Sequence, residues 1–163
     1  NDNVAVGPDE RGEICIKGPN IMKGYWNRPE ATANAIDEMG WFHSGDVGYI
    51  DEEGYLYICD RLKDMVITGG ENVYPAEVES VLFEHPAITE VAVIGLPDEK
   101  WGEAVTAVAA VTGGSDLTLE GLRDFAVAKL ARYKLPSRLH IVEALPRNPA
   151  GKVLKFELRE TLA

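Results

Sequence analysis

The first third of the chain contains short runs in which apolar and polar residues alternate. Alternation with a period of two is typical of strands, and it occurs over residues 13–17. Two more strands are predicted at residues 41–50 and 55–59, on either side of an acidic turn, and a short helix at residues 29–36 has a proline in its first turn. These elements are too few to close a core. We therefore interpret residues 1–59 as the β-rich tail of a larger domain whose other strands lie upstream.

Longer apolar runs and helical spacings follow in the rest of the chain. A strand at residues 65–68 and a glycine-rich turn at residues 69–72 precede a helix that Pro75 opens. The apolar residues of this helix recur with i, i+3, i+4 spacing, which places them on one face. Two apolar runs at residues 91–94 and 104–111 indicate strands that are covered on both faces.

The last part of the chain predicts a helix at about residues 118–130, a strand at residues 139–142 and a final helix that carries three leucines. Together these elements describe an α/β (α+β) domain of about 100 residues, within the usual domain range. We assign it to residues 65–163 and treat residues 60–64 as the connection between the two parts.

Composition and charge narrow the partners. The 163 residues are 45% hydrophobic, and the formal net charge of -11 disfavours nucleic acid as a partner. No apolar run reaches the ~18–20 residues that cross a bilayer, so we expect no transmembrane segment. A disulfide between Cys15 and Cys59 stays open, but their apolar surroundings favour buried free thiols in a cytoplasmic protein. Residues 1–3 are expected in a loop, and the missing initiator methionine is consistent with a piece of a longer protein, although processing could also explain it.

Two acidic or basic segments could carry chemistry in the first part. Asp46 directly follows Gly45 at a strand bend, and a carboxylate there can accept hydrogen bonds from a ribose diol. The alternative is a turn aspartate that binds local backbone donors. Arg61 lies in a dense charge cluster at residues 60–64, and its guanidinium fork suits a phosphate or a ribose. The alternative is a solvated linker with weak surface ion pairs.

Two further candidates lie in the second part. Gly69 and Gly70 could let a ligand run close to the backbone, because glycine has no Cβ, although a simple hairpin turn would look the same. Lys152 follows Pro149 on a loop that could deliver its charge to a developing negative charge, although most lysines are simply exposed. The Gly-Lys pair lacks the other residues of a phosphate-binding P-loop.

In their order along the chain, four segments resemble the signatures of the adenylate-forming superfamily. They are Trp-Phe-His-Ser-Gly-Asp at residues 41–46, Asp-Arg-Leu-Lys-Asp at 60–64, the glycine turn and helix start at 69–79, and Leu-Pro-Arg-Asn-Pro-Ala-Gly-Lys at 145–152. The superfamily contains acyl-CoA synthetases, beetle luciferases and adenylation domains of peptide synthetases. The resemblance implies a large N-terminal domain that ends in residues 1–59 and a small mobile C-terminal domain.

The resemblance also implies a role for each candidate. Asp46 matches a ribose-binding aspartate, and Arg61 matches an arginine that contacts the nucleotide. Asp60 and Lys63 match the hinge, where several members have aspartate at the second position, and Lys152 matches the lysine that completes the adenylation site. The implied reaction joins a carboxylic acid to ATP as an acyl-adenylate, releases pyrophosphate, and then forms a thioester with coenzyme A after the small domain rotates.

Cofactors follow from the same resemblance. Mg²⁺ is expected with ATP, but the family's phosphate loop and metal-binding glutamate lie upstream, so we expect no metal ligand and no catalysis in this chain alone. Gly69 and Gly70 would pass the pantetheine arm of coenzyme A. Trp101 and Tyr133 would flank its adenine, with Lys134 or a neighbouring arginine near its phosphate. The alternative is that both aromatic residues only cap the core.

The type of enzyme follows from the segment after the glycine turn. Glu-Asn-Val-Tyr-Pro at residues 71–75 resembles fatty-acyl and aryl-CoA ligases, and Ile67 replaces a lysine that is common in luciferases. Two alternatives stay open. One is an adenylation domain that loads a carrier protein, and the other is an interaction module without catalytic duty, in which Asp46, Arg61 and Lys152 could be replaced freely.

Overall fold

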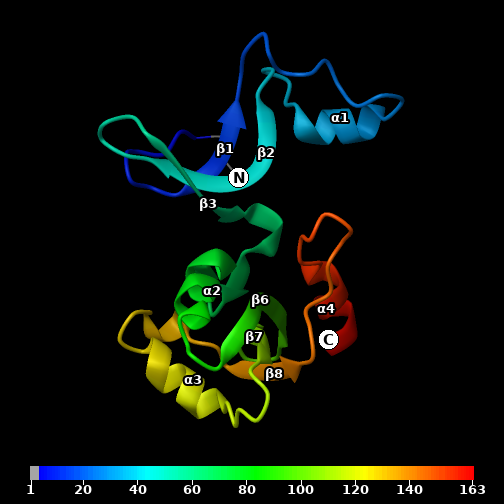
Figure 1. Ribbon diagram of the computed structural model, residues 1–163. Helices are drawn as coiled ribbons and strands as arrows, with labels where there is room; N and C mark the ends of the chain where they lie inside the picture. Colours follow the sequence, from blue (N-terminus) through cyan, green and yellow to red (C-terminus); the bar gives the residue numbers. More distant parts are fainter. Residues whose placement is uncertain (1–3) are drawn as a thin grey trace. The chain divides into compact units, whose positions relative to one another are not determined.

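The computed structural model describes residues 4–163, and the loop expected at residues 1–3 lies outside the described residues. The chain divides into two compact units, Asn1–Lys63 and Asp64–Ala163, each described here by itself (Figure 1). The division falls inside the charged segment at residues 60–64 that marks the change in sequence pattern.

The first unit is built on a three-stranded antiparallel sheet in the order β1-β2-β3. Its elements are β1 (Gly12–Ile16), α1 (Pro29–Ala35), β2 (Phe42–Ile50) and β3 (Leu56–Arg61), as the sequence predicts. Val47 is the sole buried hydrophobic side chain among the described residues of this unit. The described part of this unit therefore has hardly any core of its own.

The second unit contains a five-stranded sheet. Strands β5-β4-β7-β6 follow one another, and β8 pairs in parallel with β7. The strands are β4 (Val66–Thr68), β5 (Glu71–Val73), β6 (Ile88–Asp98), β7 (Gly102–Val111) and β8 (Arg138–Val142). The helices are α2 (Pro75–Phe83), α3 (Leu119–Ala126) and α4 (Lys155–Leu162), with 3₁₀ turns at η1 (Leu62–Asp64) and η2 (Arg132–Lys134).

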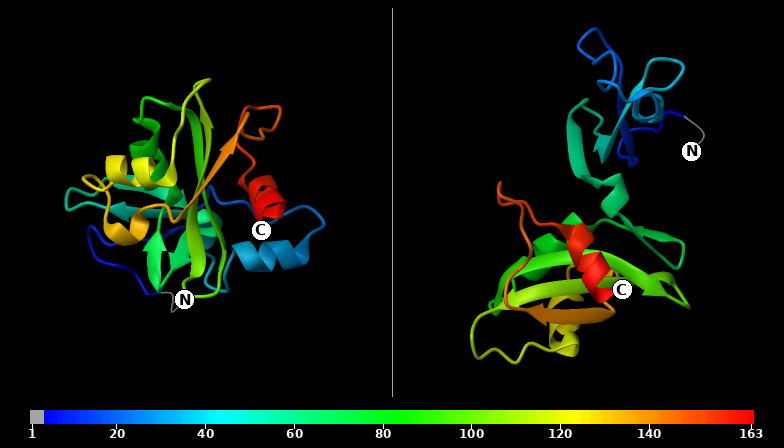
Figure 2. Two further views of the ribbon diagram at one scale, coloured as in Figure 1. Left: turned by 90° about the horizontal axis from the view of Figure 1, so that it is seen from below. Right: turned by 90° about the vertical axis from the view of Figure 1, so that its right-hand side faces the viewer.

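Both faces of this sheet are covered. Helices α2 and α3 lie on one side of β6 and β7, and α4 lies on the other (Figure 2). Val93 of β6 packs in the first core with Leu82 and Leu122, whereas its neighbour Ile94 packs in the second with Leu158. Alternate residues of one strand thus enter opposite cores, which explains the unbroken apolar runs and confirms the predicted two-sided burial.

Some local expectations were wrong. Only Gly69 and Gly70 form the glycine turn, because the next residues pair with β4 as the unpredicted strand β5. Helix α3 is shorter than predicted: it is capped by the Thr118 hydroxyl and ends at Ala126, after which the chain turns and buries Leu130. The two cysteines are free, but neither is buried, since the sheet of the first unit is largely open.

Candidate functional site

Asp46 and Arg61 lie directly opposite each other on adjacent strands. The register of β2 and β3 pairs their Cα positions, and Arg61 Nε donates to Asp46 Oδ1 at 2.8 Å. The Asp60 carboxylate accepts from the Arg61 amide at 2.7 Å. Two residues that the sequence singled out separately are therefore neighbours. Together they offer carboxylate oxygens that can accept from ligand hydroxyls, beside a planar cationic donor.

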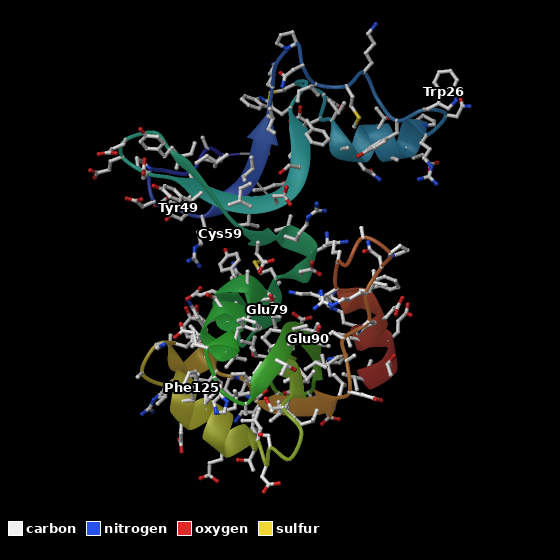
Figure 3. The ribbon with its side chains drawn as sticks, in the orientation of Figure 1. Trp26, Tyr49, Cys59, Glu79, Glu90 and Phe125 are labelled. Carbon is white, nitrogen blue, oxygen red and sulfur yellow. The ribbon has the colours of Figure 1, made fainter. Side chains whose placement is uncertain are left out.

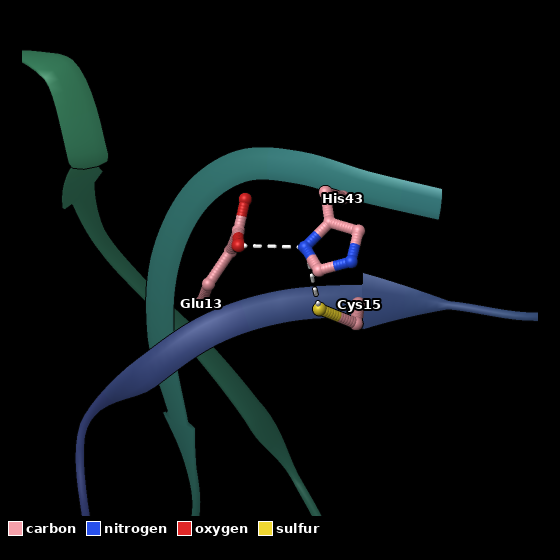
Figure 4. Close-up of side chains that lie close together, drawn as sticks. All are labelled: Glu13, Cys15 and His43. Atoms are coloured by element: carbon pink, nitrogen blue, oxygen red, sulfur yellow. Dashed lines mark hydrogen bonds and ion pairs between the residues drawn. The ribbon is translucent and has the colours of Figure 1, made fainter. Parts of the chain in front are cut away.

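The bend before Asp46 is held from strand β1 by a residue that the sequence did not single out. Glu13 Oε1 accepts from the Gly45 amide at 3.1 Å, and Glu13 Oε2 lies 2.9 Å from His43 Nδ1 (Figure 4). Gly45 has a φ of +72°, a left-handed conformation that glycine adopts without strain. The Ser44 hydroxyl accepts from the Asp46 amide at 3.1 Å. Glu13 thus fixes the backbone that presents Asp46.

His43 lies between two carboxylates. Its Nε2 is 3.7 Å from Asp37 Oδ2, opposite the contact with Glu13. The hydrogen bond to Glu13 is the main reason that the pKa of His43 is raised, and the charges of Glu13 and Asp37 add to it. The pKa of Asp37 is lowered, chiefly because its carboxylate accepts from the backbone amide of Trp41. The cluster therefore favours an imidazolium between two carboxylates.

Cys15 completes this cluster on β1. Its sulfur lies 3.6 Å from His43 Nδ1, and the ligand atoms of Glu13, Cys15 and His43 lie within 4.8 Å of one another (Figure 4). Such donors suit zinc. Desolvation and the nearby charge of Glu13 raise the pKa of the Cys15 thiol, however, and both Glu13 oxygens already have protein partners. We assign the cluster to holding the bend. Register could have revealed it, because Cys15 opposes His43.

Lys152 lies on an exposed loop before α4. The loop is closed by an isolated bridge between Arg147 and Val153 and by a hydrogen bond of 2.8 Å from the Leu154 amide to the Pro146 carbonyl. Within residues 4–163, no hydrogen bond or ion pair engages the Lys152 ammonium. The structure thus shows a fixed loop base with an available charge at its tip.

The glycine turn and Trp101 also meet. Gly69 donates its amide to the Trp101 carbonyl at 2.8 Å, and a Cβ added to Gly69 would lie 2.9 Å from Trp101 Cε3. Trp101 is at the tip of the β6–β7 hairpin and is 50% exposed, with Lys100 Nζ 4.6 Å from its ring centroid. This exposed indole beside a glycine turn and a cation can stack on an aromatic ligand.

Tyr133 and Lys134 occupy the 3₁₀ turn η2. Tyr133 is 42% exposed, whereas the Lys134 side chain is mostly buried and its ammonium lies 2.5 Å from Glu77 Oε1 of α2. Within residues 4–163, no hydrogen bond or ring contact joins Tyr133 to Trp101. Lys134 therefore forms an ion pair within the unit, and its charge is less available to a ligand than that of Lys100.

Lys63 marks the connection between the two units. Lys63 is the last residue of the first unit and lies in η1. On the other side, Asp64 Oδ1 accepts from Arg159 of α4 at 2.9 Å. Asp60 remains within β3.

Among the helices of residues 4–163, none has the length and apolar character needed to cross a membrane.

Comparison with known proteins gives the family. The model of the AMP-binding enzyme C-terminal domain matches residues 77–152. The chain is 54% identical over 159 residues to the long-chain-fatty-acid–CoA ligase FadD13 of Mycobacterium tuberculosis, covering 98% of this chain and 31% of that enzyme. It is 50% identical over 161 residues to the 2-succinylbenzoate–CoA ligase of Geobacillus kaustophilus, covering 99% of this chain and 33% of the relative.

Solved structures agree with the sequence relatives. The o-succinylbenzoate CoA synthetase MenE of Bacillus subtilis, in complex with the acyl-adenylate intermediate OSB-AMP, matches with a TM-score of 0.88 and 43% identity. The match covers 98% of this chain and 32% of that structure, and the same enzyme is also known with ATP and a magnesium ion. The chain spans about a third of the length of these relatives. Its identity to CoA ligases across nearly all its residues, together with the matched domain model, shows that this chain belongs to the adenylate-forming enzymes and corresponds to the part that carries their C-terminal domain.

Proposed function

We propose that the full-length protein containing this chain is an ATP-dependent, AMP-forming acyl-CoA ligase. A carboxylic acid and ATP would give an acyl-adenylate and pyrophosphate, and coenzyme A would then displace AMP as the thioester forms. The pairing of Asp46 with Arg61 on adjacent strands is the observation that carries this proposal. The names of the relatives include fatty-acid and aromatic substrates, so the substrate class is an organic carboxylate activated for thioester formation.

Asp46 and Arg61 would hold the nucleotide. The Asp46 carboxylate would accept hydrogen bonds from the ribose hydroxyls, and the Arg61 guanidinium would orient that carboxylate while it contacts the nucleotide. The support is the 2.8 Å ion pair, in which the Arg61 guanidinium fixes the direction of the Asp46 carboxylate. Glu13 would maintain the bend that presents Asp46.

Lys152 would supply positive charge to the adenylation step. Negative charge grows on the carboxylate and α-phosphate oxygens as the new bond forms, and a preorganised cation stabilises it. The exposed ammonium supports this role. The ligands of Mg²⁺ would come from the nucleotide and from the upstream domain, and we assign no magnesium ligand to this chain.

The second half-reaction would require movement of residues 65–163 about a hinge at Asp60 and Lys63. The division of the chain after Lys63 supports this position. After rotation, Gly69 and Gly70 would line the path of pantetheine, and Trp101 would stack on the adenine of coenzyme A.

The remaining assignments concern Tyr133, Lys134 and the location of the protein. Tyr133 would form the other side of the adenine site, and Lys134 would lie beneath it in its ion pair with Glu77. We also propose a cytoplasmic location, because two free cysteines suit a reducing compartment.

Half-reaction kinetics test the proposal in the full-length enzyme. Lys152→Ala should lower acyl-adenylate formation by roughly 10²-fold or more, the scale of losing one preorganised donor. Thioester formation from synthetic acyl-adenylate and coenzyme A should persist. The matched control is Lys129→Ala, which removes an exposed lysine of the same unit that pairs with Glu84. Full activity after replacement of Asp46, Arg61 and Lys152 would instead support an interaction module.

A further inference from the structure

The peptide unit that leads into Lys152 is held on both of its polar sides. Its carbonyl, which belongs to Gly151, accepts from Arg147 Nη1 at 2.7 Å. Its N–H, which belongs to Lys152, donates to Asn148 Oδ1 at 2.9 Å. A single peptide plane therefore has a side-chain partner at each end, from two consecutive residues of the same loop.

Asn148 makes further contacts around the same turn. Its side-chain Oδ1 also accepts from the Ala150 backbone amide at 3.0 Å, and its backbone N–H donates to the Lys152 carbonyl at 2.9 Å. The Gly151 amide donates to the Asn148 carbonyl at 2.8 Å, and Gly151 has a φ of +82°. The backbone groups on both sides of the Lys152 Cα are thus fixed, so the direction in which its side chain leaves the loop is fixed too.

The residues that hold the Lys152 peptide are connected to the sheet through Glu90 of β6 (Figure 3). Glu90 Oε1 accepts from Arg147 Nη2 at 2.9 Å, and Glu90 Oε2 accepts from the Leu145 amide at 3.0 Å. The Leu145 amide and the Arg147 guanidinium lower the pKa of Glu90. Leu145 is buried in the second core beside Val153. The base of the loop that carries Lys152 is therefore held by strand β6.

We propose that Asn148 and Arg147, anchored by Glu90, are positioning residues that preorganise Lys152 for the adenylation step. This inference rests on the proposed function. Lysine has a long flexible stem, so an ammonium aimed at a reacting phosphate gains most from a rigid backbone at its Cα. Asn148 acts through Lys152 and not through substrate, which gives it a kinetic signature that a structural residue lacks.

The test is a double-mutant cycle between Asn148→Ala and Lys152→Ala in the full-length enzyme. Asn148→Ala should slow acyl-adenylate formation by about 10-fold, since small displacements of a catalytic group are costly. It should change the rate by less than about 2-fold when Lys152 is already alanine, because residues that act as one unit are not additive. Thioester formation from synthetic acyl-adenylate should be unchanged in Asn148→Ala.

Three further variants test the positioning role of Asn148. Asn148→Ser keeps a neutral side-chain acceptor and should recover most of the lost rate. Glu90→Gln lies outside the loop and should slow only adenylation, to a smaller extent. Asp51→Ala is the matched control, because Asp51 Oδ1 accepts from the amides of Glu53 and Tyr55 with the same spacing in the other unit. It should leave both half-reactions unchanged.

The outcomes separate the two proposals. An unchanged adenylation rate in Lys152→Ala would refute the proposed function itself. Loss of adenylation in Lys152→Ala with a normal rate in Asn148→Ala would refute only the positioning role. Equal slowing of both half-reactions by Asn148→Ala, or an equal effect with and without Lys152, would also overturn the positioning role and make Asn148 a structural residue.

Discussion

Replacing Gly69 with alanine tests the contact between the glycine turn and the exposed indole. Gly69 has a φ of +59°, and a Cβ there would lie 2.9 Å from Trp101 Cε3 and 3.2 Å from Cζ3. Gly70 provides the matched control, because its φ is +85° and no atom lies within 4 Å of its added Cβ. Both variants strain the backbone, but only Gly69→Ala pushes on Trp101.

The expected magnitudes follow from these two terms. A left-handed alanine costs about 1–2 kcal/mol, and this term is common to both variants. Crowding against the ring adds about 1 kcal/mol or more at Gly69, at the low end for overpacking because Trp101 is half-exposed and can shift. Gly69→Ala should therefore lower the free energy of unfolding by about 2–3 kcal/mol, and Gly70→Ala by about 1–2 kcal/mol.

Chemical denaturation of residues 64–163 measures the difference. Trp101 is the single tryptophan of that segment, so its fluorescence follows unfolding and also reports a displaced indole. In the full-length enzyme, Gly69→Ala should raise the KM for coenzyme A several-fold and leave pyrophosphate release unchanged. Equal losses of stability in the two variants would refute the contact between Gly69 and Trp101, and an unchanged KM in Gly69→Ala would refute the adenine site at Trp101.

Three other predictions concern the core, the bend and the connection. Leu122→Ala should lower the free energy of unfolding of the second unit by about 2–5 kcal/mol in urea titrations, because this leucine is fully buried, whereas Val127→Ala at a half-exposed position should cost far less. The folded pKa of His43 is raised from 6.5, so its contribution to stability is present below pH 6.5 and is lost as pH rises through the folded pKa. Thermal melts across that range should show this dependence in the full-length enzyme and a weaker one in Glu13→Gln. Lys63→Pro should slow the thioester half-reaction more than adenylation, because proline fixes φ at the proposed hinge, and equal rates in both would count against a hinge there.

The sequence predicted the long elements, in which burial gives a regular pattern of apolar residues. The apolar runs of β6 and β7 indicated strands with two buried faces, because valine and alanine on both sides of a strand leave no polar face. Pro75 located the start of α2 correctly. The short strand β5 was missed because its three residues show no pattern, and only pairing with β4 defines it. Local pattern thus locates long elements, whereas tertiary pairing defines short ones.

The site residues divide in the same way. Asp46, Arg61 and Lys152 stood out because each lies in a short distinctive segment. Their supports did not, since Glu13 and Gly45 are 32 residues apart and Glu90 and Arg147 are 57 apart. Such pairs depend on which strands become neighbours, and no spacing along the chain encodes that.

The supports also bear on the proposed movement of residues 65–163. The contacts that fix the Lys152 backbone all lie within the second unit, from Glu90 of β6 through Arg147 to the loop. Movement of that unit as a body would therefore carry Lys152 in its prepared conformation, with no need to rebuild the loop after each turnover. In the same way, Glu13 holds the bend before Asp46 entirely within the first unit. Preorganisation inside each unit and the proposed rotation between the units would then be independent, so a hinge variant should alter the rate of that rotation, whereas Asn148 variants should alter only the adenylation step.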